Sequence, residues 1–514
     1  RHTLYQLEVM KIQNYALLIV LTLCTLPVFA QLGSTHYLPP LHTRVGITNA
    51  TIYISTPNGN AATPIEVEIT TGDGTVLQTS QIWNGNTSTY EIDVSGNSPI
   101  LVSESQLNTA ITTKGIIVNA SDLIYVSLRT YVTNHAGYLT AKGEDALGSR
   151  FRLGSARLLN TNASHSFFAS IMASQDNTTV TFSDYDAANM VFQNGLNPTI
   201  NLNTGETFVV SGYSNTVANS EGFIGALVES DKPIVVNTGN LNGNFYQGQF
   251  ASLFSDMLID QIVDESATGF EYMLIRGGGN DSSEVPIIIA NNDNTDIYVN
   301  GDFIANIPNA GDFLYLDDPS LYLPNTGDAH RNMYISTQDP SKTLYVYQML
   351  AGRNGTNEDP TNGGSNFPSA TPGINFIPPL SCFFQKTVDL IPEVTEIYPN
   401  NPQNFTGNVL ITSRVGNTVI VNGTDLNPAT ALQNPGTSEW ETYFVSGLMG
   451  DAVIVSDGPI AAGLFGSFNS AGFAGYYSGF AVTPEDTDTD ICTAAGPINL
   501  LERFDGNPPT GGTW

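Results

Sequence analysis

The sequence predicts an all-β protein built from tandem β-sandwich-like modules of about 110 residues. Three observations lead to this fold class. Short runs of β-branched and aromatic residues recur after residue 45 and are separated by Asn-Gly and Asp-Gly turns. Only 13% of the residues are charged, so the polar surface comes from Asn, Thr, Ser and Gly, which favour strands and turns over helices. The length of 514 residues exceeds that of one ordinary domain.

Two sequence elements recur in a fixed order. The first, an acidic turn that leads into an apolar strand, returns about every 110 residues. The second, with an Asn-Thr pair and an apolar strand, precedes it at residues 176–180, 293–297 and 416–420. Two elements in the same order predict tandem modules, and the turn aspartates are predicted to accept backbone N–H bonds. These aspartates are Asp122, Asp231, Asp339 and Asp457.

The spacing of these elements predicts four modules and two flanking segments. A module of about 110 residues fits a β-sandwich better than a propeller blade of about 40–50 residues, and a propeller-like arrangement of four β-sheet repeats is the alternative. The last segment combines an acidic linker with the start of a truncated Ig-like or PKD-like domain. The predicted boundaries are 1–30 for upstream residues and a signal peptide, 31–140, 141–258, 259–380 and 400–483 for the modules, and 484–514 for the last segment.

Residues 10–30 have the pattern of a secretory signal peptide. Lys11 supplies the positive start, residues 16–26 are a compact apolar run, and residues 28–30 form a small-x-small cleavage site, so cleavage is expected before Gln31. No later segment offers about 18 uninterrupted apolar residues. We therefore predict an extracellular or cell-surface protein without a transmembrane segment after cleavage.

The acidic balance of the chain excludes two classes of partner. Lys and Arg number 17 against 48 Asp and Glu, which gives a formal net charge of −31. Nucleic acids and anionic membranes are bound by clustered Lys and Arg, so neither is a predicted partner. The predicted partner is an extracellular protein or glycan ligand. After signal cleavage Cys382 and Cys492 remain, and whether they pair stays open.

Two acidic patterns are predicted as the places where calcium, the one possible cofactor, would bind. Residues 256–265 are the best helix candidate, and their aspartates are spaced i, i+4 and i+8 on one helix face. Residues 486–490 have the pattern D-x-D-x-D but lack the Gly and the distal Glu of an EF-hand loop. A solvated helix face and a flexible acidic linker are the alternatives. The aspartates are Asp256, Asp260, Asp264, Asp486, Asp488 and Asp490.

The search for catalytic patterns finds none. The motifs H-E-x-x-H, G-x-S-x-G and G-x-x-x-x-G-K-[ST] do not occur, and the histidines are scattered. We therefore predict no catalytic and no cofactor-binding residues, and no enzymatic activity. The alternative is a secreted hydrolase, with carbohydrate as a candidate substrate, that works through surface carboxylates.

Aromatic residues near the end of the fourth module are candidates for ligand contacts. Tyr476, Tyr477 and Phe480 lie in or beside a Gly-rich segment at residues 471–479. Loops carried on a rigid scaffold are where binding proteins place such contacts. The alternative is that the three residues belong to the core.

Four segments resemble the N-terminal domain family of IgGFc-binding proteins. They are the aromatic strand start at 148–151, the "DNT" strand pair at 168–180, the "D-x-P-I-x-V" strand at 231–240, and the "D-x-L-x-x-Q" segment at 256–262. The family's Cys after the Gly of the third segment and the Pro-Pro after the fourth are missing here. The resemblance covers residues 120–480 and implies an extracellular, non-enzymatic binding or adhesion role. It does not imply that this chain binds immunoglobulin.

Overall fold

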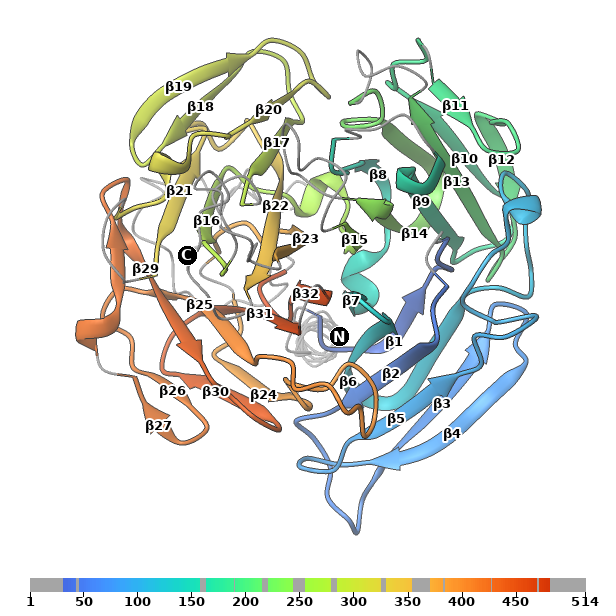
Figure 1. Ribbon diagram of the computed structural model, residues 1–514, viewed down its shortest axis with the longest axis horizontal. Helices are drawn as coiled ribbons and strands as arrows, with labels where there is room; N and C mark the ends of the chain where they lie inside the picture. The colour runs from blue at the N-terminus through green and yellow to red at the C-terminus, as the bar shows by residue number, and fades with distance from the viewer. Residues whose placement is uncertain are drawn as a thin grey trace, which may run out of the picture. The chain divides into compact units, whose positions relative to one another are not determined.

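The computed structural model shows an all-β chain, as the sequence predicts (Figure 1). Within the described residues the elements are β-strands and short 3₁₀ turns, and no helix is long and apolar enough to cross a membrane. The chain divides into two compact units, Val28–Thr483 and a second that joins Arg1–Pro27 to Pro484–Trp514, and every described residue belongs to the first. These residues are 31–42, 46–157, 163–188, 190–214, 221–243, 255–278, 284–324, 330–353, 370–381, 384–426, 428–468 and 471–480.

The first two sheets are each organised around one strand of 17 residues. The strands are β1 (Gly33–Leu38), β2 (Asn49–Ser55), β3 (Ile65–Thr71), β4 (Val76–Ile82), β5 (Ser88–Ile92), β6 (Ile116–Val132), β7 (His135–Ala141), β8 (Gly148–Arg152), β9 (Phe167–Ala173), β10 (Thr178–Ser183), β11 (Met190–Phe192), β12 (Thr199–Leu202), β13 (Thr207–Ser214), β14 (Leu227–Gly243) and β15 (Asp256–Ile262). The first half of β6 pairs with β1 and β3, and its second half pairs with β2 and β7. In the same way β14 pairs first with β8 and β10, then with β9 and β15.

The remaining described strands form four smaller sheets. They are β16 (Glu271–Ile275), β17 (Pro286–Ala290), β18 (Thr295–Val299), β19 (Asp302–Ile307), β20 (Phe313–Tyr315), β21 (Asn332–Ser336), β22 (Leu344–Arg353), β23 (Ala370–Phe376), β24 (Thr387–Ile391), β25 (Asn408–Arg414), β26 (Val419–Val421), β27 (Thr424–Asp425), β28 (Leu432–Asn434), β29 (Thr437–Ser446), β30 (Ala452–Ser456), β31 (Ile460–Phe468) and β32 (Ala471–Tyr476). The sheet orders are β16-β21-β18-β19, β20-β17-β22-β23, β24-β30-β26-β27 and β28-β29-β25-β31-β32.

The four aspartates predicted to close a recurring turn lie in two settings. Asp339 and Asp457 lie in turns, between β21 and β22 and between β30 and β31. Asp122 and Asp231 lie inside β6 and β14, so the prediction of a chain turn is wrong there. At both positions the long strand changes its pairing partner and continues instead of turning. The four carboxylates each accept a backbone N–H, from Leu123, Thr179, Ser341 and Thr418.

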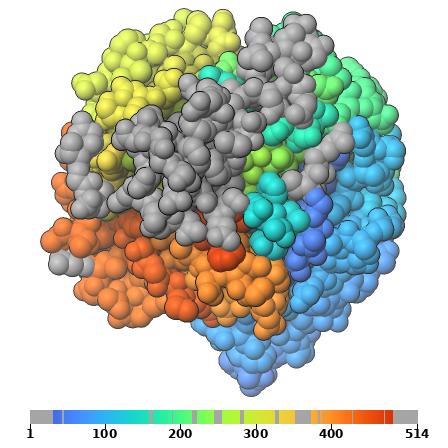
Figure 2. All heavy atoms as spheres, viewed as in Figure 1, coloured from blue at the N-terminus to red at the C-terminus, as the bar shows by residue number. Residues whose placement is uncertain are grey.

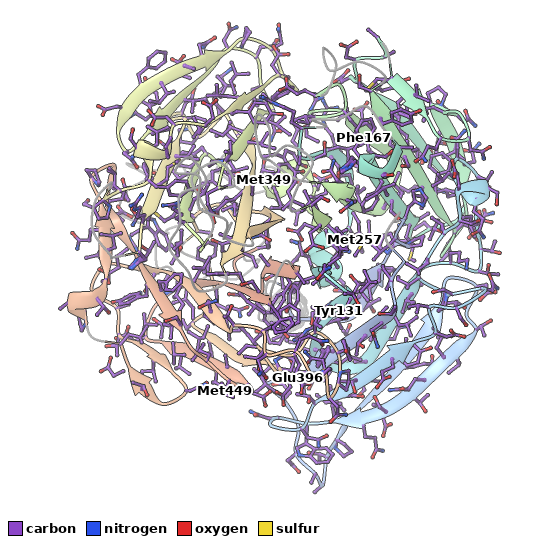
Figure 3. The ribbon with its side chains drawn as sticks, in the orientation of Figure 1. Tyr131, Phe167, Met257, Met349, Glu396 and Met449 are labelled. Carbon is purple, nitrogen blue, oxygen red and sulfur yellow. The ribbon has the colours of Figure 1, made fainter. Side chains whose placement is uncertain are left out.

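Four strands pack around a common centre. β7 contacts β15, β15 contacts β23, β23 contacts β32 and β32 contacts β7, and Figure 1 shows them meeting in the middle of the unit. Glycine permits the close approach, because a Cβ on Gly475 of β32 would lie 2.7 Å from Cδ1 of the rigid Tyr138 ring in β7. Met257 of β15 borders the same central region (Figure 3). This closed cycle of strands is the geometry expected for the alternative fold, a propeller-like arrangement of four β-sheet repeats. The boundaries of the four modules stay predictions.

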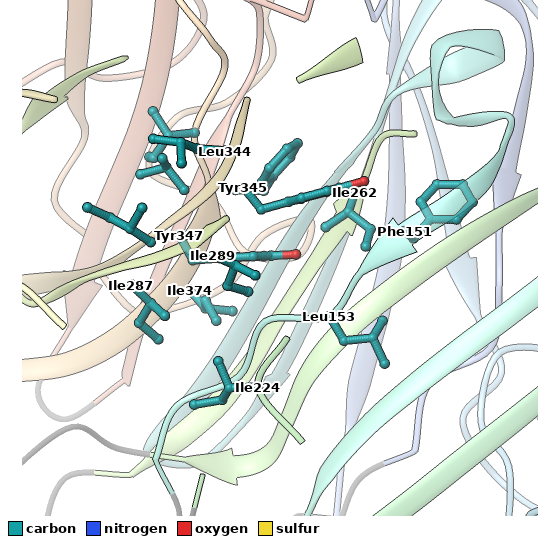
Figure 4. Close-up of a cluster of buried hydrophobic side chains, with 14 of the residues drawn as sticks. Phe151, Leu153, Ile224, Ile262, Ile287, Ile289, Leu344, Tyr345, Tyr347 and Ile374 are labelled. Carbon is teal, nitrogen blue, oxygen red and sulfur yellow. The ribbon is translucent and has the colours of Figure 1, made fainter. Parts of the chain in front are cut away.

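The largest hydrophobic cluster is shared between sheets from the middle of the sequence. Figure 4 shows Tyr345 and Tyr347 of β22 on one side of this cluster and Phe151 of β8 on the other, with Ile262 of β15 between them. The two buried hydroxyl groups are satisfied, since Tyr345 donates to the carbonyl of Val263 at 2.8 Å and Tyr347 to that of Arg152 at 2.7 Å. Because apolar burial is worth roughly 25 cal/mol per Å², this common core holds the two sheets together.

One arginine joins β6 to a loop from the C-terminal part of the unit. Arg129 of β6 is buried, and its guanidinium donates to the carbonyls of Pro392, Glu393 and Glu396 at 2.6, 2.8 and 2.6 Å. It also stacks 3.8 Å above the centroid of the Tyr53 ring. Figure 2 shows the N-terminal strands in blue beside the C-terminal strands in orange on the face that it draws. A charged group with several partners therefore ties β6 to the loop that follows β24.

Candidate functional site

The aromatic residues predicted as ligand contacts are part of the core, so that prediction is wrong. Tyr476, Tyr477 and Phe480 are all buried. The Phe480 ring stacks on Phe376 with centroids 5.2 Å apart, and the Tyr477 ring lies 5.2 Å from that of Tyr125. The Gly-rich segment that carries them forms β32 at the centre of the unit, where its small residues allow strands to approach.

The predicted helix over residues 256–265 is also wrong, because most of this segment is strand β15. An i, i+4 spacing places residues on one face of a strand as well as of a helix, so the aspartates alone could not distinguish the two. The apolar residues between them are buried on both faces of β15, which is the pattern of a central strand. Asp264 lies beyond the strand, where its side chain accepts the N–H of Ser266 as the cap of a 3₁₀ turn (Glu265–Ala267).

Asp256 connects three of the four central strands. Its Oδ1 accepts the N–H of Ala136 in β7 at 2.8 Å, and its Oδ2 accepts the N–H of Gly472 in β32 at 3.0 Å. His135 Nδ1 lies 3.6 Å from Oδ1. Burial raises the pKa of Asp256 to about 6 although these donors act against it, and the neighbouring Asp256 carboxylate raises the pKa of His135.

Asp260 makes the second connection, through a buried ion pair. Its Oδ1 lies 2.9 Å from Nζ of Lys142, and its Oδ2 accepts the N–H of Phe376 in β23 at 2.7 Å. Burial raises the pKa of Asp260 and lowers that of Lys142, so desolvation outweighs the attraction between the two charges. The neighbouring Gln261 completes the connection, because its Oε1 accepts the N–H of Lys142 at 2.6 Å. Sequence reasoning missed this lysine, which no local pattern links to the aspartates.

The three aspartates of this segment therefore have separate protein partners. Asp264 accepts the N–H groups of Ser149 and Arg150 through Oδ2, away from the partners of Asp256 and Asp260. Among the described residues, no group of three or more His, Cys, Asp or Glu side chains could hold a metal ion. The helix that supplied the reason for predicting a shared calcium ion here does not form. The other predicted calcium segment, residues 486–490, and both Cys382 and Cys492 lie outside the described residues.

An open groove of about 570 Å³ lies between the loops next to β10 and β14 on one side and the segment from β19 to β20 on the other. We call it the acidic groove. One wall consists of residues 184–186, after β10, and 221–224, before β14. The other wall consists of residues 305–308 and 310–314, from the end of β19 to β20. Close backbone contact joins the walls, because a Cβ on Gly225 would lie 2.0 Å from the carbonyl oxygen of Gly311. Glycine is thus required at this junction.

The acidic groove carries more negative than positive charge. Its lining includes four carboxylates and no Lys or Arg side chain. Two arginines form ion pairs with two of these carboxylates. Arg152 is buried, and its Nη1 lies 2.6 Å from Oδ2 of Asp184. Nε of Arg157 lies 2.6 Å from Oε1 of Glu221, and its guanidinium lies 4.4 Å from the centroid of the Tyr315 ring. Neither of these two ion pairs involves the remaining two carboxylates, those of Asp186 and Asp312. Four carboxylates against two guanidinium groups give the groove a net negative charge.

A sheet edge and an apolar patch border the acidic groove. β19 is the last strand of its sheet, so within the described residues one side of it has no neighbouring strand. Phe303 and Ile304 of this strand are exposed, Phe303 to 56%. Free strand edges and exposed apolar residues are common sites of protein association. Sequence reasoning missed the groove because its walls come from loops far apart in the chain.

Comparison with known protein families supplies a match that covers most of the chain. The family described as IgGFc binding protein matches residues 137–466. The comparison with curated proteins finds no match. One similar solved structure is the crystal structure of Streptomyces avermitilis alpha-L-rhamnosidase complexed with L-rhamnose, at 10% identity and a TM-score of 0.12. That alignment covers 84% of this chain and 57% of the rhamnosidase, so the chain spans less than two thirds of that protein.

Proposed function

The chain belongs to the IgGFc binding protein family, and from this premise we propose that it is an extracellular adhesion protein without catalytic activity. Its ligand is a protein that presents a basic, extended segment, and the acidic groove is where that segment binds. The observation that carries this proposal is the acidic groove itself, a concave surface with net negative charge beside the edge of β19, which has no further strand next to it in the part of the chain that the structure describes.

The chemistry of the groove favours a protein segment over a glycan. Ile307, Phe313 and Leu314 line it next to the carboxylates, so alternating apolar and basic side chains find both kinds of partner. An extended segment can also add to the edge of β19 through main-chain hydrogen bonds, which is a common mode of peptide recognition. Charge complementarity speeds such encounters and makes them dependent on salt.

A peptide-binding measurement tests this proposal. The probe is a synthetic peptide of alternating Lys and Val, about eight residues long so that it matches one strand, and the control probe alternates Glu and Val. We expect the Lys peptide to bind the full chain, with affinity falling as salt rises, and the Glu peptide not to bind. Purified IgG Fc and a glycan array are tested in parallel on the same protein.

Charge reversal locates the binding. The double variant Asp186→Lys and Asp312→Lys is expected to lower affinity for the Lys peptide at least tenfold, because both side chains are exposed and line the groove. The matched control is Glu68→Lys with Glu91→Lys, which reverses two exposed charges on β3 and β5. Equal binding by both double variants would place the site elsewhere. Binding of glycans with unchanged affinity in the groove variant, or hydrolysis of them, would replace the proposal with a carbohydrate function.

A further inference from the structure

Gln31 lies in a closely packed position at the beginning of the described chain. Its side chain is 1% exposed, and Nε2 donates to the carbonyl of Tyr476 in β32 at 3.3 Å. Its backbone nitrogen lies 3.3 Å from Oδ2 of Asp145, which belongs to the 3₁₀ turn Gly143–Ala146 that follows β7. The residue at which signal cleavage is expected therefore connects two segments next to the central strands.

Asp145 is a half-buried carboxyl group that attracts positive charge. Burial, with a smaller contribution from the like charge of Glu144, raises its pKa to about 7 although the N–H of Gln31 acts in the opposite direction. A peptide N–H offers one hydrogen and no net charge. A cation at the same place would offer a charge-assisted hydrogen bond, which is roughly twice as strong as a neutral one.

The backbone of Gln31 points to the same conclusion. Its φ angle is +62°, in the left-handed region that residues with a side chain rarely adopt and that costs of order 1 kcal/mol or more. The φ angle exists only while a peptide bond joins Gln31 to the residue before it. Hydrolysis of that bond removes the strain and leaves the nitrogen opposite Asp145.

We propose that the chain is cut between Ala30 and Gln31 and that the new α-ammonium group of Gln31 forms an ion pair with Asp145. The bond is hydrolysed: the oxygen of a water molecule bonds to the carbonyl carbon of Ala30 and the C–N bond breaks. Ala30 leaves as a carboxylate, and the nitrogen of Gln31 takes up both protons of the water, which makes it an ammonium group. An α-amino group has an ordinary pKa of about 7.7–8.0, so it is mostly charged at neutral pH. The ion pair then lowers the pKa of Asp145 toward its ordinary value.

The consequence is that removal of the signal peptide adds a stabilising ion pair to the folded chain. Before the cut, Asp145 faces a neutral N–H beside a strained residue; afterwards it faces a cation, and Gln31 keeps its contact with Tyr476. Only the chain that has been exported and cut before Gln31 gains this stabilisation. This inference does not depend on the acidic groove or on the ligand.

Melting curves of matched chains test the proposal. One chain begins at Gln31 with a free amine, the other keeps Phe29 and Ala30, and both run to Trp514, each with Asp145 or with Asp145→Asn. At pH 6.5 we expect the Gln31 chain to melt about 2 °C or more above the extended chain. The difference should shrink in the Asp145→Asn pair to the part that comes from relief of backbone strain at Gln31, and it should shrink in the same way for Asp145 above about pH 9, where the amine is neutral. Glu91→Gln, a change at an exposed carboxylate of β5, is the control and should leave the difference intact.

Three results would overturn the proposal. Equal melting of the free-amine and extended chains at every pH means that no ion pair forms. An equal advantage with Asp145→Asn means that another group is responsible; if that variant folds poorly in both chains, the pH profile of the unaltered pair still decides. A protein secreted from a bacterial host that begins at another residue, or is one ammonia lighter because the α-nitrogen has closed onto Cδ of Gln31, lacks the cation, and N-terminal mass spectrometry distinguishes these cases.

Discussion

Aspartates at the centre of the protein and aspartates at the acidic groove have opposite environments. Asp256 and Asp260 are buried, and each of their carboxylate oxygens accepts a hydrogen bond from the protein. Asp184, Asp186 and Asp312 are exposed at the groove. The difference teaches that the position of a carboxylate in the fold, rather than the acidity of its sequence neighbourhood, decides whether it stabilises strands or remains accessible to a ligand.

The largest expected effect of a single change is at the buried ion pair. Asp260→Ala leaves Lys142 buried without its carboxylate and removes the acceptor of the Phe376 N–H, so we expect a loss of about 3–5 kcal/mol in unfolding free energy. Thermal and guanidinium unfolding measure the loss.

The double variant Lys142→Met with Asp260→Asn is the matched control. It removes both charges and keeps an oxygen for Phe376, so it should be more stable than Asp260→Ala. A loss below about 1 kcal/mol for Asp260→Ala would contradict the structural role of the pair.

The second-largest expected effect is on the way the unfolding free energy depends on pH. Asp256 has a folded-state pKa of about 6 against an ordinary value of 3.8, so its contribution to stability falls as pH rises from about 4 to 6, by roughly 2–3 kcal/mol. His135 acts in the same direction, since a raised folded-state pKa stabilises below 6.5 and that contribution is lost as pH rises through the raised value.

Asp256→Asn should remove most of this slope. We compare the unfolding free energy of the wild type and the variant between pH 4 and 8, so that groups common to both cancel. One such group is His36, whose pKa burial lowers to about 4 and which therefore destabilises the fold as pH falls below 6.5. The loss of the Gly472 acceptor shifts the whole curve of the variant downward. Parallel curves for the two proteins would show that Asp256 does not titrate as described.

The third expected effect is smaller and concerns two of the recurring aspartates, which are exposed. Asp231→Ala removes the acceptor for the N–H of Thr179, and Asp457→Ala removes that for Thr418, so each should cost about 1 kcal/mol. Asp231→Asn and Asp457→Asn keep an acceptor oxygen and should melt near the wild type. Unchanged melting of Asp231→Ala together with lost ligand binding would instead identify a functional carboxylate.

The sequence predicts the all-β class, because strand and turn propensities are local. It also predicts that the recurring aspartates accept backbone N–H groups, although Asp231 and Asp457 accept them from distant residues. It does not predict the centre. The spacing of Asp256 and Asp260 fits helix and strand alike, and the partner of Asp260, Lys142, comes from a distant segment. Tyr476 and Phe480 resemble exposed contacts until β32 is placed among three other strands. The acidic groove joins residues 184–186 to residues 310–314, a pairing that only the packed sheets create.

The smallest expected effect is at the groove, and it completes the comparison. Asp186 is exposed, so Asp186→Ala should change unfolding free energy by no more than about 0.5 kcal/mol, the usual range for surface substitutions. Its side chain accepts the N–H of Ala188 in an exposed loop, where water replaces the lost acceptor. The same variant should weaken binding of the Lys-Val peptide, because it removes one of the four carboxylates that set the charge of the groove. Differential scanning calorimetry and peptide titration on one preparation check both halves. A loss of stability as large as that of Asp260→Ala would show that the groove carboxylates brace the fold as the central ones do, and a stable variant with unchanged affinity would remove Asp186 from the ligand surface.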